Sequence, residues 1–186
     1  MKKITGWLIR LCILLLICDL VLLPLTPAMA YFRLETAAEV GLDGLLSTFE
    51  YDFDDGLGNL VKILLIYAWR NPHTAVTSAF LLLCGICAAV LLLQAIRVLE
   101  HLSAGEIFSN KNAVSLKRAA VSSFVISAAA LVRTVCTLRW RGISEALFSY
   151  TALFIPLFLM VGLLFLIMSG LFSQAAEMKE ENDLTI

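Results

Sequence analysis

Two long apolar runs, residues 74–97 and 119–138, are separated by a short polar break that contains Gly105, Ser109 and Asn110. Each run has about the 20 residues that a helix needs to cross the hydrocarbon core of a bilayer. Gly105 is placed to end the helix before the break, and Ser109 or Asn110 to cap the helix after it. The pattern therefore predicts a membrane hairpin, with two antiparallel helices joined by a tight turn.

The composition extends this prediction to the whole chain. Hydrophobic residues make up 60% of the sequence and charged residues 16%, whereas charged residues are about 25% of a typical soluble domain. Two further apolar runs, residues 7–29 and 148–171, bring the number of candidate spans to four. We expect an all-α fold, an integral membrane four-helix bundle that forms a single membrane domain over residues 1–186.

The first apolar run also has the parts of a secretory signal peptide. Basic residues precede an apolar core, and the sequence Ala28-Met29-Ala30 has the form of a cleavage site. Asp19 interrupts the apolar core, however, and the run is long enough to span a membrane. We expect an uncleaved first helix; removal of residues 1–30 stays open as the alternative.

An acidic stretch, residues 31–59, follows the first run. Its carboxylates around Asp54-Asp55-Gly56 superficially resemble a calcium loop, but the ligand spacing of an EF-hand is missing. We interpret this stretch as a solvated acidic loop outside the membrane.

Residues 59–70 are apolar but too few to span a membrane. They end in aromatic and basic side chains, which predicts a short interfacial helix. Pro72 suits the first turn of the next helix.

No sequence motif predicts an enzyme, a metal ligand set or a cofactor. HExxH and GxSxG motifs are missing, and His101 reads as a lone interfacial histidine. Cys84 and Cys87 have C-x-x-C spacing, but in the middle of a bilayer thiols behave as small apolar residues that favour close helix packing. The cysteines all lie in apolar runs, which does not favour a disulfide framework; they are Cys12, Cys18, Cys84, Cys87 and Cys136.

Basic residues set the expected orientation. Short loops on the cytoplasmic side of membrane proteins are enriched in Lys and Arg. Here such residues surround the N-terminus and the hairpin turn, which fall on one side of a four-span protein; they are Lys2, Lys3, Arg10, Arg97, Lys111, Lys117 and Arg118. We therefore expect a multi-pass protein of the cell membrane with both termini and the tail, residues 173–186, in the cytoplasm.

Two ionisable residues lie within the predicted spans, Asp19 and Arg133. A charge within a span is costly and marks a candidate functional site. Because a helix rises about 1.5 Å per residue, the two lie within about 3 Å of the same depth. The sequence predicts an intramembrane ion pair. The alternative is that Arg133 reaches towards the membrane surface near Arg139 and that Asp19 is protonated.

The turn and the tail carry a family resemblance. The pattern Leu102-x-x-Gly105-x-x-Phe108-Ser109-x-x-Asn112-x-x-x-Leu116-Lys117 resembles the turn of the bacterial DUF2975 membrane proteins, and residues 177–186 resemble their acidic ending. The resemblance implies no catalytic residues. It does imply a membrane partner for a small helix-turn-helix regulator. The formal net charge of −1 does not favour direct contact with nucleic acid. The cytoplasmic interaction surface would then include Gly105, Phe108, Lys111, Asn112, Glu180, Glu181, Asn182 and Asp183.

Two functional classes remain on this evidence. A regulatory or scaffolding protein needs only packed helices and a cytoplasmic surface, and we expect this function. A small transporter or channel subunit that uses Asp19 and Arg133 is the alternative. The acidic tail either meets a basic regulator or packs against the basic turn of its own chain, and whether the chain forms a homo-oligomer is left open.

Overall fold

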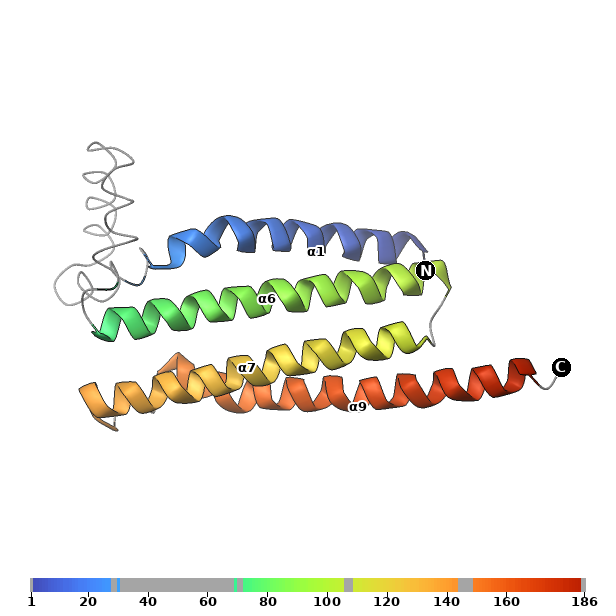
Figure 1. Cartoon of the computed structure of the whole chain (residues 1–186). Helices are drawn as coiled ribbons and strands as arrows, with labels where there is room; N and C mark the ends of the chain where they lie inside the picture. Colours follow the sequence, from blue (N-terminus) through green and yellow to red (C-terminus); the bar gives the residue numbers. More distant parts are fainter. Residues whose placement is uncertain are drawn as a thin grey trace. The chain divides into compact units, whose positions relative to one another are not determined.

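The computed structural model describes residues 2–27, 30, 69, 72–105, 109–143 and 149–184. Four long helices make up this part of the chain: α1 (Lys2–Leu22), α6 (Pro72–Ala104), α7 (Asn110–Arg141) and α9 (Tyr150–Leu184) (Figure 1). A 3-10 turn, η1 (Leu23–Leu25), follows α1. Each long helix is apolar enough to cross a membrane, and the described residues contain no strand. The predicted all-α fold with four membrane spans is confirmed.

Helix boundaries agree with the local chemistry of the sequence. α6 begins at Pro72, as predicted, and ends at Ala104. Gly105 follows with φ +88, a left-handed conformation that glycine adopts without the steric cost of a Cβ atom. The predicted acidic loop and interfacial helix, residues 31–70, lie outside the described residues except for Trp69, whose side chain is exposed.

The last helix is longer than the sequence analysis expected. α9 spans 35 residues and continues to Leu184, so residues 173–184 are not a separate polar tail but the final turns of the fourth helix. The shift from apolar to charged residues does not end the helix, because Gln, Glu, Lys and Met are all strong helix formers.

Residue contacts divide the chain into two compact units, a larger one with residues 1–19 and 86–186 and a smaller one with residues 20–85. The single domain over residues 1–186 therefore stays a prediction. In the smaller unit, the start of α6 buries the hydroxyl residues Thr74, Thr77 and Ser78. Thr77 donates to the carbonyl of His73 at 3.0 Å, a bond within the helix that satisfies its hydroxyl away from water.

The core of the larger unit lies between α7 and α9, which run antiparallel side by side (Figure 1). Ser127 donates to the carbonyl of Ile155 at 2.9 Å, and Ser169 donates to the carbonyl of Ala113 at 2.7 Å. Ala113 and Ser127 are separated by 14 positions, as are Ile155 and Ser169, so the two helices keep the same register over about 21 Å.

Small side chains make this close contact between the helices. The buried residues of α7 in the core are mostly Ala and Ser: Ala113, Ala119, Ala120, Ser123, Ile126, Ser127 and Ala130. On α9, a Cβ atom at Gly162 would lie 2.9 Å from the Phe124 ring, so any other residue at this position would require the ring to shift. Small residues of this kind allow two helices to approach closely within a membrane.

Candidate functional site

The turn between α6 and α7 is held by backbone bonds on both sides. The amide of Gly105 donates to the carbonyl of Leu102 at 3.2 Å, and the amide of Asn112 donates to the carbonyl of Ser109 at 3.0 Å. Ser109 occupies the N-cap position of α7 with an extended backbone, as predicted, but its hydroxyl makes no capping bond. Phe108, a predicted surface residue, lies outside the described residues.

Two side-chain bonds join three helices next to this turn. Nδ1 of His101 on α6 lies 2.7 Å from Oδ1 of Asn112 on α7, and the ring nitrogen donates to the amide oxygen. The neighbouring residue, Ala113, accepts the bond from Ser169 of α9. We call this group of residues the helix junction. His101 is therefore not the lone histidine that the sequence analysis expected, because a sequence does not show which residue lies opposite on the next helix.

Asn112 has a different role from the one predicted. Its side chain is 1% exposed, so it lies inside the helix junction and not on the interaction surface. A buried amide is costly unless it is hydrogen-bonded, and the bond to His101 meets that need. Of the other predicted surface residues at the turn, Gly105 and Lys111 are exposed.

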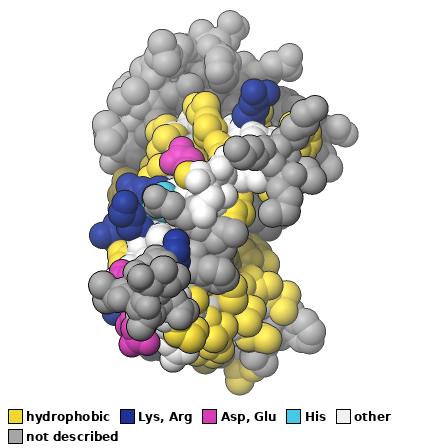
Figure 2. Space-filling view, turned by 90° about the vertical axis from the view of Figure 1, so that its right-hand side faces the viewer, with side chains coloured by type: hydrophobic (Ala, Val, Ile, Leu, Met, Phe, Trp, Pro, Cys, Tyr) yellow, Lys and Arg dark blue, Asp and Glu magenta, His cyan; other side chains and the backbone are white. Residues whose placement is uncertain are grey.

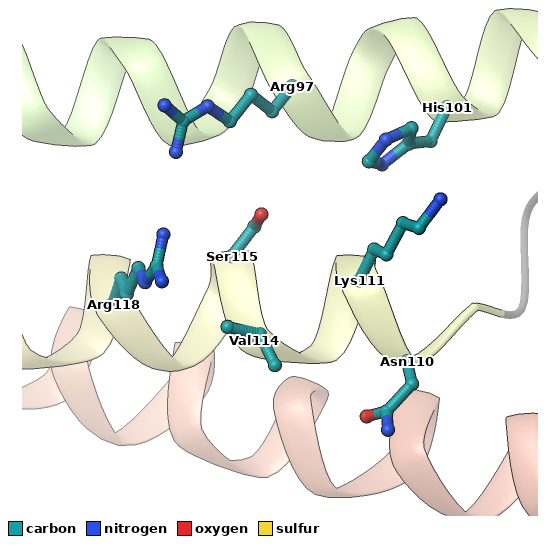
Figure 3. A pocket seen from close by; sticks show the side chains of 7 residues that line it. All are labelled: Arg97, His101, Asn110, Lys111, Val114, Ser115 and Arg118. Carbon is teal, nitrogen blue, oxygen red and sulfur yellow. The ribbon is translucent and has the colours of Figure 1, made fainter.

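An open pocket of about 420 Å³ lies beside the helix junction, between α6 and α7. Figure 3 shows Arg97 and His101 reaching into it from α6, and Lys111, Ser115 and Arg118 reaching into it from α7. Val114 also lines it, whereas Asn110 at its edge points away from α6 (Figure 3). The spacing of these residues in the sequence indicates that they share helix faces. Arg97 and His101 are four residues apart, and Lys111 and Arg118 are seven residues apart, so each pair lies on one face of its helix.

Three basic side chains line the pocket, so positive charge is concentrated there. Within the described part of the chain, no carboxylate forms an ion pair with Arg97, Lys111 or Arg118. Ser115 is 6% exposed, and its hydroxyl has no hydrogen-bond partner among the described residues. We call this feature the basic pocket. Three cations and an unpaired hydroxyl around one cavity can together accept an anion with several oxygen atoms.

The end of α9 supplies negative charge on the same end of the larger unit. Glu177, Glu180 and Glu181 are exposed. Figure 2, which looks onto this end, shows Lys and Arg side chains gathered beside a histidine, with acidic side chains on the same side of the view. The backbone of Asn182 and Asp183 belongs to α9, but their side chains lie outside the described part.

Arg133 of α7 contacts the aromatic side chain of Tyr150. Its guanidinium donates to the hydroxyl of Tyr150 at 2.8 Å and lies 5.2 Å from the centre of the same ring. The described residues contain no ion pair between Arg133 and Asp19, whose Oδ2 is buried without a hydrogen-bond partner. The predicted pairing of the two charges stays a prediction.

Sequence analysis missed one polar residue within a span. Gln94 of α6 is buried, and its Oε1 has no hydrogen-bond partner. Gln94 interrupts the apolar run over residues 74–97, so its position in the sequence was a usable signal. The described residues also contain no group of three side chains that could hold a metal ion, and the five cysteines are not in disulfides.

Comparison with known proteins identifies one family. A family model described as "Protein of unknown function (DUF2975)" matches residues 24–186. No curated protein and no solved structure matches the chain. The match covers the helix junction, the basic pocket and the acidic end of α9.

Proposed function

The chain belongs to the DUF2975 family, whose function is unknown, and on that premise we propose that this multi-pass membrane protein is a regulatory or scaffolding partner. Its working surface is the end of the larger unit that carries the α6–α7 turn and the final turns of α9. Its partner is a small, basic, DNA-binding regulator of the helix-turn-helix kind.

The observation that carries this proposal is the length of α9. Ser169 of α9 lies level with Ala113 of α7. α7 begins only three residues before Ala113, at Asn110, whereas α9 continues for 15 residues after Ser169, to Leu184. The last turns of α9 therefore extend beyond the start of α7 (Figure 1). An ordered helix binds a partner with a smaller loss of conformational entropy than a flexible tail does.

Charge on these last turns fits a basic partner. Glu177, Glu180 and Glu181 are three and four residues apart, so they share one face of α9. A concentrated acidic face raises the rate at which a basic protein associates and competes with the phosphates of DNA for the same cations. Binding at this face would hold a regulator at the membrane and away from DNA.

Orientation follows from the basic residues of the same end. Arg97, Lys111, Lys117 and Arg118 surround the α6–α7 turn, and Lys and Arg in short loops favour the cytoplasmic side. We place the turn, the end of α9 and both termini in the cytoplasm, where a DNA-binding partner is found. An engineered cysteine at exposed Lys179, labelled from the cytoplasmic side only, tests this orientation.

Crosslinking in native membranes tests the partner. A chain tagged at the N-terminus is crosslinked and purified, and the captured proteins are identified by mass spectrometry. The test variant replaces Glu177, Glu180 and Glu181 with Gln, which removes the charges and keeps good helix formers. We expect the unaltered chain to capture a small DNA-binding protein and the triple variant to lose it.

The control is Glu100→Gln, which removes an exposed carboxylate from α6 and should leave capture unchanged. Loss of capture should also change the expression of the genes that the regulator controls, while the amount of inserted membrane protein stays the same. Recovery of only the chain itself or of other membrane proteins would reject the regulatory proposal.

Transport is the second candidate, and one observation favours it. Two spans of the larger unit bury polar oxygens without a partner, Oδ2 of Asp19 and Oε1 of Gln94. Polar groups of this kind within a membrane are costly and often line the path of an ion or substrate. If the chain transports a solute, Asp19→Asn or Arg133→Gln abolishes flux through purified protein in liposomes, whereas the triple Glu variant leaves flux intact.

A further inference from the structure

The basic pocket lies at the level where the membrane interior ends. The apolar residues of α6 continue up to Arg97, and those of α7 begin directly after Arg118. Arg and Lys side chains at the ends of spans place their charges among the lipid headgroups. The pocket between the two helices therefore opens where phosphate groups of phospholipids are concentrated.

Repulsion among the positive charges of the basic pocket favours the binding of an anion. Arg97, Lys111 and Arg118 line one cavity of about 420 Å³, and in the described part of the chain none of them has a carboxylate partner. Gathering three cations around one cavity costs electrostatic free energy unless an anion enters. Water and salt reduce this cost, but a pocket at the edge of a low-dielectric layer is screened less than an open surface.

Ser115 provides an independent indication of a ligand. Its side chain is 6% exposed, yet its hydroxyl makes no bond to the described residues. Most Ser and Thr hydroxyls of α7 behave differently and bond to a carbonyl of their own helix: Ser122, Ser123, Thr134 and Thr137. Figure 3 shows the Ser115 hydroxyl directed into the space between α6 and α7. Ser115 is thus a mostly buried residue whose hydroxyl faces the open basic pocket and bonds to no described residue, and such a donor is placed to bind an oxygen of an anion.

We propose that the basic pocket binds a net-anionic phosphate group, held by Arg97, Lys111 and Arg118 with Ser115 at its base. This goes beyond the regulatory function, which uses the acidic end of α9. Two arginines present planar sets of donors that match phosphate oxygens, and a lysine adds a point charge. Val114, 44% exposed at the wall of the pocket, offers apolar contact to the carbon chain attached to the phosphate. Both an anionic phospholipid and a soluble phosphate ester have this chemistry.

Binding is measured on the purified full chain in a neutral detergent. Native mass spectrometry counts the molecules of phosphatidylglycerol that the protein retains, with phosphatidylcholine as the zwitterionic comparison. Glycerol phosphate is the soluble probe. We expect the chain to retain phosphatidylglycerol in preference to phosphatidylcholine, because the net charge of the headgroup is what the cations recognise.

The main variant is the double substitution Arg97→Gln and Arg118→Gln. Each lost charge-assisted bond should weaken phosphate binding about tenfold or more. The matched control, Lys117→Gln with Arg139→Gln, removes two exposed positive charges that do not line the pocket and should keep binding. Ser115→Ala should weaken binding by a smaller factor, since it removes one neutral donor.

A second variant leaves every basic residue in place. Val114→Glu puts a carboxylate into the pocket from an exposed position, so folding should be unaffected while phosphate is repelled. Circular dichroism and monodisperse elution confirm that each variant is folded. If the double variant or Val114→Glu is folded and binds phosphatidylglycerol as the control does, the proposal is wrong.

The probes also separate the two sources of phosphate. Retained phosphatidylglycerol that glycerol phosphate does not displace supports a lipid site, and binding of glycerol phosphate with loss of the lipid supports a soluble ester. Equal retention of phosphatidylglycerol and phosphatidylcholine would reject an anion site. Lipid retention that begins only after Glu177 and Glu180 are replaced with Gln would show that the pocket holds the end of its own chain, which also overturns the proposal.

Discussion

α7 and α9 share one interface, but they are built from different residues. The most apolar window of α7 has a mean hydropathy of 1.8 and is 39% buried, whereas that of α9 has a mean hydropathy of 2.6 and is 11% buried. In water the more apolar helix would be the inner one. Lipid removes that driving force, so helices associate through close packing and bonds between polar groups. The less apolar helix is therefore the more buried of the two here.

The largest effect should come from the closest contact in this interface. A Cβ atom at Gly162 of α9 would lie 2.9 Å from the Phe124 ring of α7. Gly162→Leu adds four carbon atoms at that point and should reduce the free energy of unfolding by about 3 kcal/mol. The loss is measured by unfolding in mixed micelles with increasing dodecyl sulfate, followed by circular dichroism.

Gly170 provides the matched control for this prediction. It lies on the same helix, and a Cβ atom there would meet nothing within 4 Å. Gly170→Leu should leave stability nearly unchanged, and Phe124→Ala should restore part of what Gly162→Leu loses. Equal stability of the two leucine variants would mean that α7 and α9 do not pack through Gly162.

The next effect concerns the helix junction. Asn112→Ala removes the acceptor of the His101 bond and leaves a part-buried ring nitrogen without this partner. The free energy of unfolding should fall by about 1–3 kcal/mol. Asn110→Ala is the control, because Asn110 is exposed two residues earlier in the same helix. In a double-mutant cycle with His101→Ala, additive losses would contradict the proposed bond.

These two predictions also show what could be read from the sequence. The four spans, the turn at Gly105 and the start of α6 at Pro72 follow from local composition, because run length and backbone preference act within a few residues. Contacts between helices depend on the residue opposite, which one sequence does not specify. Asn112 was thus placed on the surface, and Phe124 and Gly162 were not recognised as neighbours.

Part of the candidate site could be predicted from the sequence. Its basic residues were recognised, but as an orientation signal and not as the lining of a pocket. The antiparallel hairpin brings the two helix faces together, and the spacing of Arg97 from His101 and of Lys111 from Arg118 indicates those faces. The exception is Ser115, whose missing hydrogen bond is visible only in the structure.

A smaller effect distinguishes bonds between helices from bonds within one. Ser169→Ala removes a buried hydroxyl that joins α9 to α7, whereas Ser123→Ala removes another buried hydroxyl, which bonds within α7. The first should cost about 0.5–1 kcal/mol and the second less, because alanine is the better helix former. The same micelle assay measures both, and an equal loss would show that the bond from Ser169 does not hold the helices together.

The smallest effect is expected at the other end of the α7–α9 interface, where Arg133 donates to Tyr150 at an exposed position. Tyr150→Phe removes the hydroxyl and keeps the ring that lies 5.2 Å from the guanidinium. Water or headgroups can replace the lost acceptor, so the free energy of unfolding should change by less than about 0.5 kcal/mol. Tyr150→Leu removes the ring as well and should cost more, since it ends the cation–π contact. If Tyr150→Phe were instead as damaging as Asn112→Ala, Arg133 would be held in a dry environment, and the case for an ionic partner such as Asp19 would become stronger.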